Sequence, residues 1–251
     1  MKVAAIYDIH GNLPALNAVL EEINEVFPDL ILVGGDIVSG PMPRATLERL
    51  LNLGNRVHFI RGNADREVVT AFDGLPLDPT LPEDVREATL WTAKQLEYRH
   101  RNFLAQLPEQ AILPTDNLGD VLFCHGSPRS DEEIITVATP EARLREILIG
   151  VEQNIIVCGH THMQFDRHMD NKEIVNAGSV GMPYGEPGAY WLLLGPQIVL
   201  QKTNYDLKQA AEDILRSGYP QAQDFADNNV LKPPTAAEAV EVFERIAARK
   251  S

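Results

Sequence analysis

The sequence predicts an α/β protein in which a two-sheet β-sandwich is flanked by α-helices. Along residues 1–62, short apolar runs alternate with longer amphipathic stretches, which is typical of βαβ units around a parallel sheet. From residue 119 onward, several apolar runs follow one another with shorter spacers, which favours more antiparallel pairing and a second sheet. The chain of 251 residues is 44% hydrophobic and is large enough to bury a substantial core.

The first part of the chain is expected to form three buried strands joined by two helices. The first helix carries Leu16, Val19, Leu20 and Ile23 at helical spacing. In chain order the elements are strand 2–7, helix 13–26, strand 29–33, helix 47–53 and strand 56–60. In a parallel sheet of this kind, ligands bind beyond the carboxyl ends of the strands.

Residues 64–118 differ from the segment before them. Pro76, Pro79 and Pro82 interrupt the chain, and residues 83–107 then predict one or two polar helices. We interpret residues 64–118 as a helical insertion that lies over the ligand site.

The remaining residues predict further strands and then C-terminal helices. The expected strands are 120–124, 154–158, 164–169 and 173–175, followed by a hairpin of strands 189–194 and 198–202. Helices are expected at 206–217 and 235–250, with a hinge at 232–235. We therefore expect one domain over residues 1–205 and a helical extension over 206–251 that packs on it.

The overall charge excludes some classes of partner. Lys and Arg number 22 and Asp and Glu 36, a net charge of -14, so bulk binding of nucleic acid is not expected. A small phosphorylated substrate fits if a local positive centre, such as bound metal, offsets this field. Two cysteines give no disulfide framework, no signal peptide is expected, and no apolar run approaches the ~20 residues of a membrane span. We expect a cytoplasmic protein.

Seven side chains that can bind metal follow five of the predicted strands. They come at the carboxyl ends of the strands, and four of the seven histidines in the chain are among them. These residues are Asp8, His10, Asp36, Asn63, His125, His160 and His162. Each alone could cap a turn or a helix, but together at one edge they indicate a metal centre.

The donor types restrict the metal. Imidazole nitrogens with carboxylate oxygens suit Mn, Fe, Zn, Ni or Co rather than Mg or Ca alone. Seven ligands exceed what one tetrahedral ion uses, so we expect two divalent ions, with Mn favoured. Two such ions ~3.5–4 Å apart can clamp a phosphoryl group and generate hydroxide near neutral pH.

The order of these blocks resembles the signature of the calcineurin-like metallophosphoesterases. Asp8-x-His10, Gly35-Asp36, Gly62-Asn63, His125-Gly126 and Gly159-His160-x-His162 match it in sequence, and Asn176-Ala177-Gly178-Ser179 resembles a loop of the small prokaryotic members. The resemblance covers about residues 1–205 and implies a β-sandwich with a dinuclear centre. It implies one metal held by Asp8, His10, Asp36 and His162, and another held by Asp36, Asn63, His125 and His160.

One position departs from the family pattern. In many members a histidine that protonates the leaving group follows the Gly-Asn pair, whereas this chain has Ala64 there. Ala64 cannot donate a proton, which favours substrates with good leaving groups. The next residue, Asp65, is a substitute acid acting through water, an orienter of the metal ligands, or the N-cap of the next helix, and we favour the N-cap.

Other polar residues near the motifs have two interpretations each. Asn12 is a helix N-cap or a substrate ligand, and Arg61 forms a structural ion pair or contacts a phosphate oxygen. Ser179 and Tyr184 pack within a loop or line the pocket. Three histidines lie outside the motifs and are interpreted as surface or strand residues, namely His58, His100 and His168.

The favoured function is a metal-dependent phosphoesterase that hydrolyses phosphodiester bonds. A hydroxide that bridges the two ions attacks phosphorus, while Asn63 and His125 steady the charge that develops. One alternative is a phosphomonoesterase for a small metabolite. Another is a non-catalytic scaffold, as in the retromer subunit of this family, although all seven ligand positions are intact here. The sequence leaves open the physiological substrate and whether the chain forms a homo-oligomer.

Overall fold

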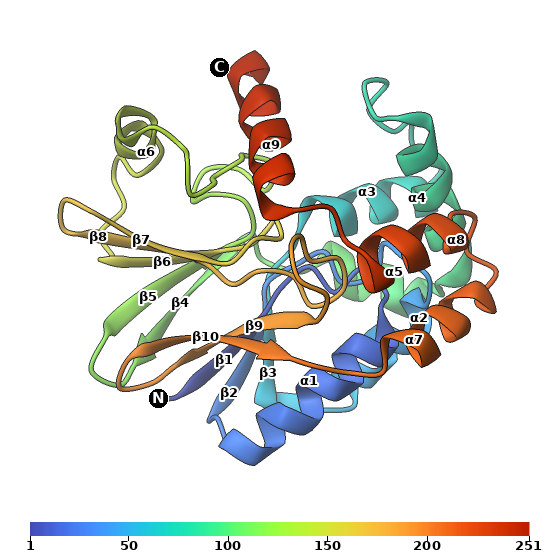
Figure 1. Cartoon of the computed structure of the whole chain (residues 1–251), viewed down its shortest axis with the longest axis horizontal. Helices are drawn as coiled ribbons and strands as arrows, with labels where there is room; N and C mark the ends of the chain where they lie inside the picture. Colours follow the sequence, from blue (N-terminus) through green and yellow to red (C-terminus); the bar gives the residue numbers. More distant parts are fainter. Residues whose placement is uncertain (251) are drawn as a thin grey trace.

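A computed structural model describes residues 1–250, with side chains described as far as residue 249. The chain forms two five-stranded mixed sheets that pack face to face and are flanked by helices, as the sequence predicted (Figure 1). The strand order is β10-β9-β1-β2-β3 in the first sheet and β4-β5-β6-β8-β7 in the second. Among the residues so described, no helix combines the length and apolar character that crossing a membrane requires.

The first sheet is built from the predicted βαβαβ segment and the late hairpin. Its strands are β1 (Val3–Ile6), β2 (Leu30–Val33), β3 (Val57–Phe59), β9 (Ala189–Leu194) and β10 (Ile198–Thr203). β1, β2 and β3 run parallel, and β9 pairs antiparallel with β1. The side chains of β1 alternate between two buried layers: Val3 and Ala5 face the second sheet, while Ala4 and Ile6 face the helical layer. Because both faces are covered, the strand is apolar throughout.

The second sheet differs in part from expectation. Its strands are β4 (Gln110–Thr115), β5 (Gly119–Cys124), β6 (Ile155–Cys158), β7 (Phe165–Met169) and β8 (Lys172–Asn176). The inner strands β5, β6 and β8 are parallel, so the largely antiparallel arrangement that we predicted is wrong for them. The helix α6 (Glu141–Ile147), which was not predicted, supplies the crossover that parallel β5 and β6 require.

Strand β4 lies within the range 64–118 that we had interpreted as a helical insertion. It pairs antiparallel with β5 at the edge of the second sheet. Pro114 is compatible with this place because an edge strand does not need every backbone N–H for pairing. The rest of that range forms α3 (Asn63–Phe72), α4 (Glu83–Gln95) and α5 (Tyr98–Ala105).

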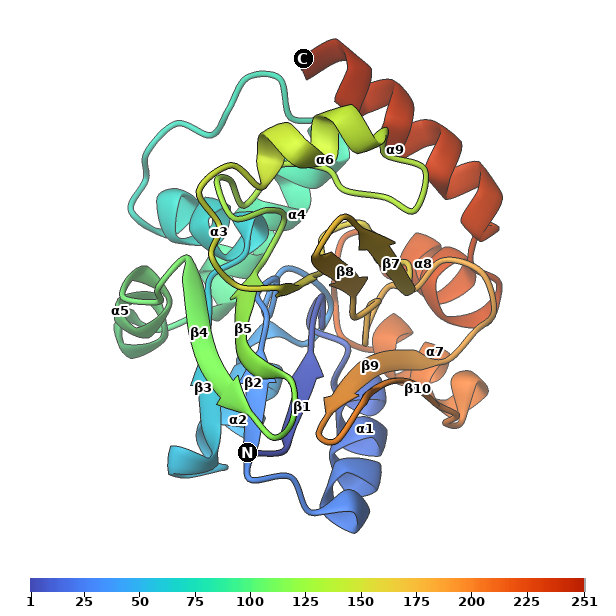
Figure 2. The same cartoon turned by 90° about the vertical axis from the view of Figure 1, so that its left-hand side faces the viewer.

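The helices α1 (Leu13–Val26) and α2 (Pro43–Leu51) cover the outer face of the first sheet. α2 begins four residues earlier than predicted, because Pro43 occupies its first turn, where a missing N–H costs nothing. A short 3-10 turn, Gly54–Arg56, leads into β3. In Figure 2, β1 and β5 both run toward the end of the molecule where α3, α4 and α6 lie.

The C-terminal segment consists of α7 (Leu207–Leu215), α8 (Ala222–Phe225), a π-helical turn (Ala226–Leu231) and α9 (Ala236–Lys250). Its small apolar core, which includes Ile214 and Phe225, packs against Met42 and Met182 from the body of the protein. Glu244 of α9 accepts hydrogen bonds from the hydroxyls of Thr136 and Thr139. Tyr219 and Phe225 of this segment line one pocket with His10 and Asp36, so the segment lies beside the loops that carry the predicted ligands.

Candidate metal centre

The candidate ligands emerge from loops at the carboxyl ends of the strands. Six of them form two triplets, and within each triplet the donor atoms lie within 4.8 Å of one another. The first triplet is Asp8, His10 and His162, and the second is Asp36, His125 and His160. A third group, Asp166, His168 and Glu173, lies on β7 and β8 and is largely exposed.

The backbone of the ligand loops is unusual. Eight described non-glycine residues have positive φ, and five of them are candidate ligands: Asp8, His10, Asp36, His160 and His162. Such conformations cost free energy and persist only where the surroundings fix them. The Asp8 N–H donates to the Gly35 carbonyl at 3.1 Å and the His10 N–H to the Asp36 carbonyl at 2.9 Å. These bonds hold the loops after β1 and β2 together.

In the first triplet, the Nε2 atoms of His10 and His162 carry no hydrogen and face one another. His10 donates Nδ1–H to the Ser39 carbonyl at 3.0 Å, and His162 donates Nδ1–H to the Met182 carbonyl at 2.8 Å. Because a carbonyl can only accept, the hydrogen must sit on Nδ1, which leaves Nε2 for a metal. The two Nε2 atoms are 3.2 Å apart, about the separation of two imidazole nitrogens that bind one ion at ~2.1 Å.

The second triplet meets the first at Asp36. His125 donates Nδ1–H to the Gly34 carbonyl at 2.8 Å, and its Nε2 lies 3.3 Å from Oδ2 of Asp36. The same Oδ2 lies 3.7 Å from Nε2 of His10 in the first triplet. One carboxylate oxygen of Asp36 therefore faces both groups, while its Oδ1 accepts the Ala64 N–H at 2.8 Å.

Three atoms of these residues are buried without a hydrogen-bond partner. They are Oδ1 of Asp8, Oδ1 of Asn63 and Nε2 of His125. Buried polar atoms without partners are costly, so several in one place call for a ligand. The set consists of carboxylate and amide oxygens with imidazole nitrogens, which suits divalent transition metals. The residues therefore fit the metal group that the sequence predicted.

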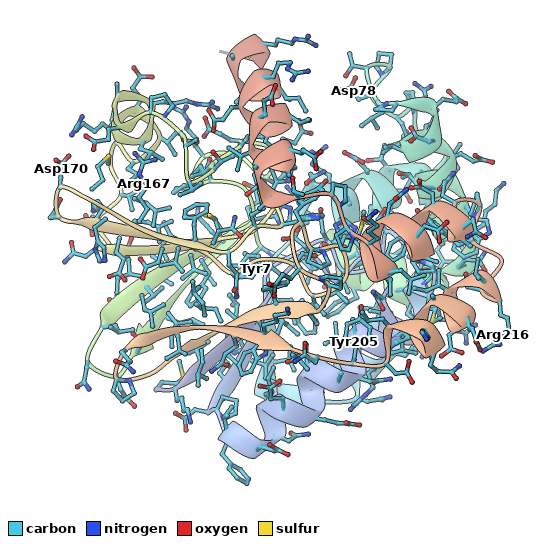
Figure 3. All side chains as sticks on the ribbon, in the orientation of Figure 1. Tyr7, Asp78, Arg167, Asp170, Tyr205 and Arg216 are labelled. Atoms are coloured by element: carbon cyan, nitrogen blue, oxygen red, sulfur yellow. The ribbon has the colours of Figure 1, made fainter. Side chains whose placement is uncertain are left out.

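Two glycines of the motifs make room for the carboxylates. A Cβ at Gly62 would lie 2.1 Å from Oδ1 of Asp36, and a Cβ at Gly159 would lie 2.6 Å from Oδ2 of Asp8. Both separations are well below van der Waals contact. Tyr7, at the centre of the molecule in Figure 3, also packs its ring against Gly159.

Burial and charge shift the pKa values of the ligands strongly in the metal-free protein. Burial would lower the pKa of His125, but the Asp36 carboxylate outweighs it and raises that pKa to about 10. Burial would raise the pKa of Asp36, but His125 and His10 hold it below its usual value. Burial and the charge of His125 lower the pKa of His160 to about 4. The opposite charge of His125 thus stabilises the buried Asp36 carboxylate.

Asp65 is placed differently from the favoured N-cap prediction. Gly62 is the N-cap of α3, and Asp65 is the third helical residue. Its carboxylate accepts the Gly62 N–H at 3.1 Å and the Ile37 N–H at 2.9 Å. These bonds tie the start of α3 to the residue after Asp36, so Asp65 orients the loops that carry the ligands. Burial, and then Asp36, raise its pKa to about 7.

The two suggested substrate contacts have structural partners. Asn12 is the N-cap of α1: its Oδ1 accepts the Ala15 N–H at 3.2 Å and its Nδ2 donates to the Gly181 carbonyl at 3.0 Å. Arg61 donates from Nη2 to Glu109 at 2.8 Å. For both residues the structure shows the capping or ion-pair arrangement that the sequence offered as the alternative.

Residues of the loop after β8 contact two of the candidate ligands. Ser179 is buried and its hydroxyl donates to the Asp8 carbonyl at 2.7 Å. The Tyr184 ring stacks on His162 with centroids 5.8 Å apart, and it contacts Phe243 of α9 at 6.0 Å. Both residues have structural contacts with the candidate ligands, Ser179 with Asp8 and Tyr184 with His162.

The histidines outside the motifs lie away from the centre. His58 and His168 are exposed on strands, as predicted. His100 is buried, so its assignment as a surface or strand residue is wrong. Its Nδ1 accepts the Glu97 N–H at 3.1 Å at the start of α5, and its Nε2 lies 3.4 Å from Glu48.

A pocket of about 280 Å³ adjoins the ligands, and part of its wall comes from the range 64–118 that was expected to lie over the site. The individual wall residues were not predicted from the sequence. Glu67 of α3 is one of them, and burial together with Asp36 raises its pKa to about 7. Glu67 follows Asn63 by four residues, so helical spacing could have placed the two on one face. Tyr219 and Asp224 come from the C-terminal segment, and no sequence signal connects them with the motifs.

Comparison with known proteins identifies the family. A family model described as the calcineurin-like phosphoesterase superfamily domain matches residues 1–195. The chain is 27% identical over 247 residues to an uncharacterised protein of Methanocaldococcus jannaschii, covering 87% of this chain and 94% of that protein. It is also 27% identical over 204 residues to phosphodiesterase YfcE of Escherichia coli, covering 77% of this chain and 87% of YfcE.

Solved structures share the fold. A hypothetical protein from Pyrococcus horikoshii superimposes with a TM-score of 0.80 at 22% identity, covering 93% of this chain and 99% of the other. A metallophosphoesterase from Sphaerobacter thermophilus superimposes with a TM-score of 0.72 at 26% identity, covering 90% of this chain and 97% of the other. With the family model spanning most of its length, the chain belongs to the calcineurin-like phosphoesterase superfamily and is a metallophosphoesterase.

Proposed function

We propose that the protein hydrolyses phosphodiester bonds with two divalent metal ions, Mn being the favoured metal. One ion is held by Asp8, His10, Asp36 and His162, and the other by Asp36, Asn63, His125 and His160. The observation that carries this proposal is the pair of triplets that meet at Oδ2 of Asp36, together with the three buried atoms that lack partners.

Two bound ions would supply a hydroxide nucleophile near neutral pH and would offset the negative charge of the phosphoryl group. The protein holds the reacting groups in place. Asp8 and Asp36 are fixed by backbone N–H donors, and three histidines are oriented through Nδ1 by backbone carbonyls. We assign Asn63 and His125 to stabilising the charge that develops on the phosphoryl group, with His125 acting through the ion that its Nε2 would hold.

Two features favour a diester over a monoester. Ala64 lines the pocket at the position where a proton donor would stand, so a good leaving group is needed. Among the described residues that line the pocket, none is Lys or Arg, so no side chain balances the second negative charge of a monoester. The similarity to phosphodiesterase YfcE supports the same choice. The cytoplasmic location stays a prediction from the sequence.

The proposal is tested on purified protein that is stripped of metal and reloaded separately with Mn, Fe, Zn, Ni, Co or Mg. We expect hydrolysis of bis(p-nitrophenyl) phosphate that depends on metal and is highest with Mn, with much slower hydrolysis of p-nitrophenyl phosphate. Faster monoester hydrolysis would favour the monoesterase alternative. Two bound ions without hydrolysis of either ester would favour a scaffold.

A further inference from the structure

The pocket beside the metal centre has a marked charge asymmetry. Its floor is formed by His10, Asp36 and Asn63, and its walls come from α3, from α4 with the residues before it, and from the C-terminal segment. Three wall residues are acidic, namely Glu67, Asp84 and Asp224, while the described lining contains no Lys or Arg. Leu81, Val85 and Phe225 make much of the remaining wall apolar.

Two of these carboxylates, Asp84 and Asp224, line the same pocket as Tyr219. The Tyr219 ring is held edge-on by Trp91 of α4 at 5.4 Å and by Phe225 of α8 at 6.0 Å between centroids. Burial, and then the charges of Asp224 and Asp84, raise the pKa of Tyr219 to about 12. The pocket wall thus contains an aromatic ring and two anions that come from segments far apart in the sequence.

Neither carboxylate is neutralised by the protein. Asp224 accepts a hydrogen bond from Nδ2 of Asn228 at 2.7 Å, and no salt bridge within residues 1–249 involves Asp84 or Asp224. Carboxylates beside an aromatic face attract a quaternary or primary ammonium group through Coulomb and cation–π interactions. The same charges repel a carboxylate or a second phosphate.

We propose that the pocket selects phosphodiesters whose second substituent is cationic or neutral and disfavours anionic ones, and that Asp84 and Asp224 impose this selection. The inference rests on the proposed phosphodiesterase function and names its substrate class. It disfavours polyphosphate substrates. An alkylammonium substituent of the size of choline fits a pocket of about 280 Å³ that also receives the phosphoryl group.

The test compares three p-nitrophenyl phosphodiesters that share a leaving group. Their second substituents are choline, its uncharged isostere 3,3-dimethylbutyl alcohol, and 2-carboxyethyl alcohol. Two exposed carboxylates should give about threefold in kcat/KM at each step, in the order cationic, neutral, anionic. The difference should lie in KM, because the rim charges act on binding and not on the chemical step, and 0.5 M NaCl should reduce it.

The double variant Asp84→Asn/Asp224→Asn should compress these ratios to less than about twofold. The matched control Asp120→Asn/Glu152→Gln removes two exposed charges near the amino ends of β5 and β6, away from the pocket. This control should leave the ratios of kcat/KM unchanged. Equal kcat/KM for all three esters in the unmodified enzyme would overturn the inference while leaving the proposed function intact. Failure of the metal-loaded enzyme to hydrolyse even the uncharged ester would instead overturn the proposed function.

Discussion

Replacing Gly62 by alanine should reduce the amount of metal that the protein binds. The backbone at Gly62 has φ -95° and ψ 170°, which alanine adopts freely, so Gly62→Ala introduces no backbone strain. The new Cβ would lie 2.1 Å from Oδ1 of Asp36 and 2.4 Å from its backbone nitrogen, more than about 1 Å inside van der Waals contact. Either the Asp36 carboxylate or the start of α3 must move.

The expected magnitude follows from this overlap. Overpacking of a tight site costs about 1–3 kcal/mol, which corresponds to a fall in Tm of about 2–12 °C in a protein of this size. Because Asp36 faces both triplets, its displacement should reduce the content of both ions. Differential scanning calorimetry in chelator measures the first effect, and elemental analysis after Mn loading and gel filtration measures the second.

Gly195→Ala is the matched control, since its Cβ would lie 3.6 Å from the nearest atom, Cγ of Lys2. It should leave both Tm and metal content unchanged. If Gly62→Ala retained two tightly bound ions per chain, the bridging assignment of Asp36 and its dependence on Gly62 would both be wrong.

Four further predictions concern the same centre. Asp36→Asn should lower the content of both ions whereas His162→Ala should lower mainly one, and elemental analysis that found equal losses would contradict this. Bound Mn should raise Tm, with ~2.7 kcal/mol of stabilisation at 100 times the dissociation constant; a Tm insensitive to chelation and readdition would count against the site. The pKa of His125 is raised to about 10, so His125 is protonated at pH 7 in the metal-free protein. It must lose that proton to bind metal. Calorimetry in buffers of different ionisation enthalpy should therefore show proton release on metal binding and a metal affinity that rises with pH. Ala64→His should raise kcat mostly for diesters with poor leaving groups, by up to ~10²-fold, and a flat dependence on leaving-group pKa in the unmodified enzyme would refute the missing-donor argument.

The first sheet and the metal ligands could be predicted from the sequence because the pattern that indicates each of them is local in the chain. Each ligand directly follows a short apolar strand, and the parallel order of β1, β2 and β3 brings the strand ends to one edge. The strand β4 was missed because it is a half-exposed edge strand: Ile112 is 52% exposed and Pro114 interrupts the pattern. Because α6 was not predicted from the sequence, nothing indicated the crossover that makes β5 and β6 parallel.

The part of the pocket wall that comes from the C-terminal segment could not be predicted in the same way. Tyr219 and Asp224 reach the metal centre only because the C-terminal segment packs on Met42 and Met182 and contacts α4 through Trp91. Such packing depends on the whole fold and leaves no motif. Asp65 shows a smaller error of the same kind, since the helix begins three residues earlier than an N-cap at Asp65 would place it.

The dinuclear centre is tested most directly by anomalous diffraction at the manganese edge from crystals of Mn-loaded protein. We expect two anomalous peaks about 3.5–4 Å apart, one beside His10 and His162 and one beside His125 and His160, with Asp36 between them. A single peak, or peaks confined to the exposed group of Asp166, His168 and Glu173, would contradict the two-metal account.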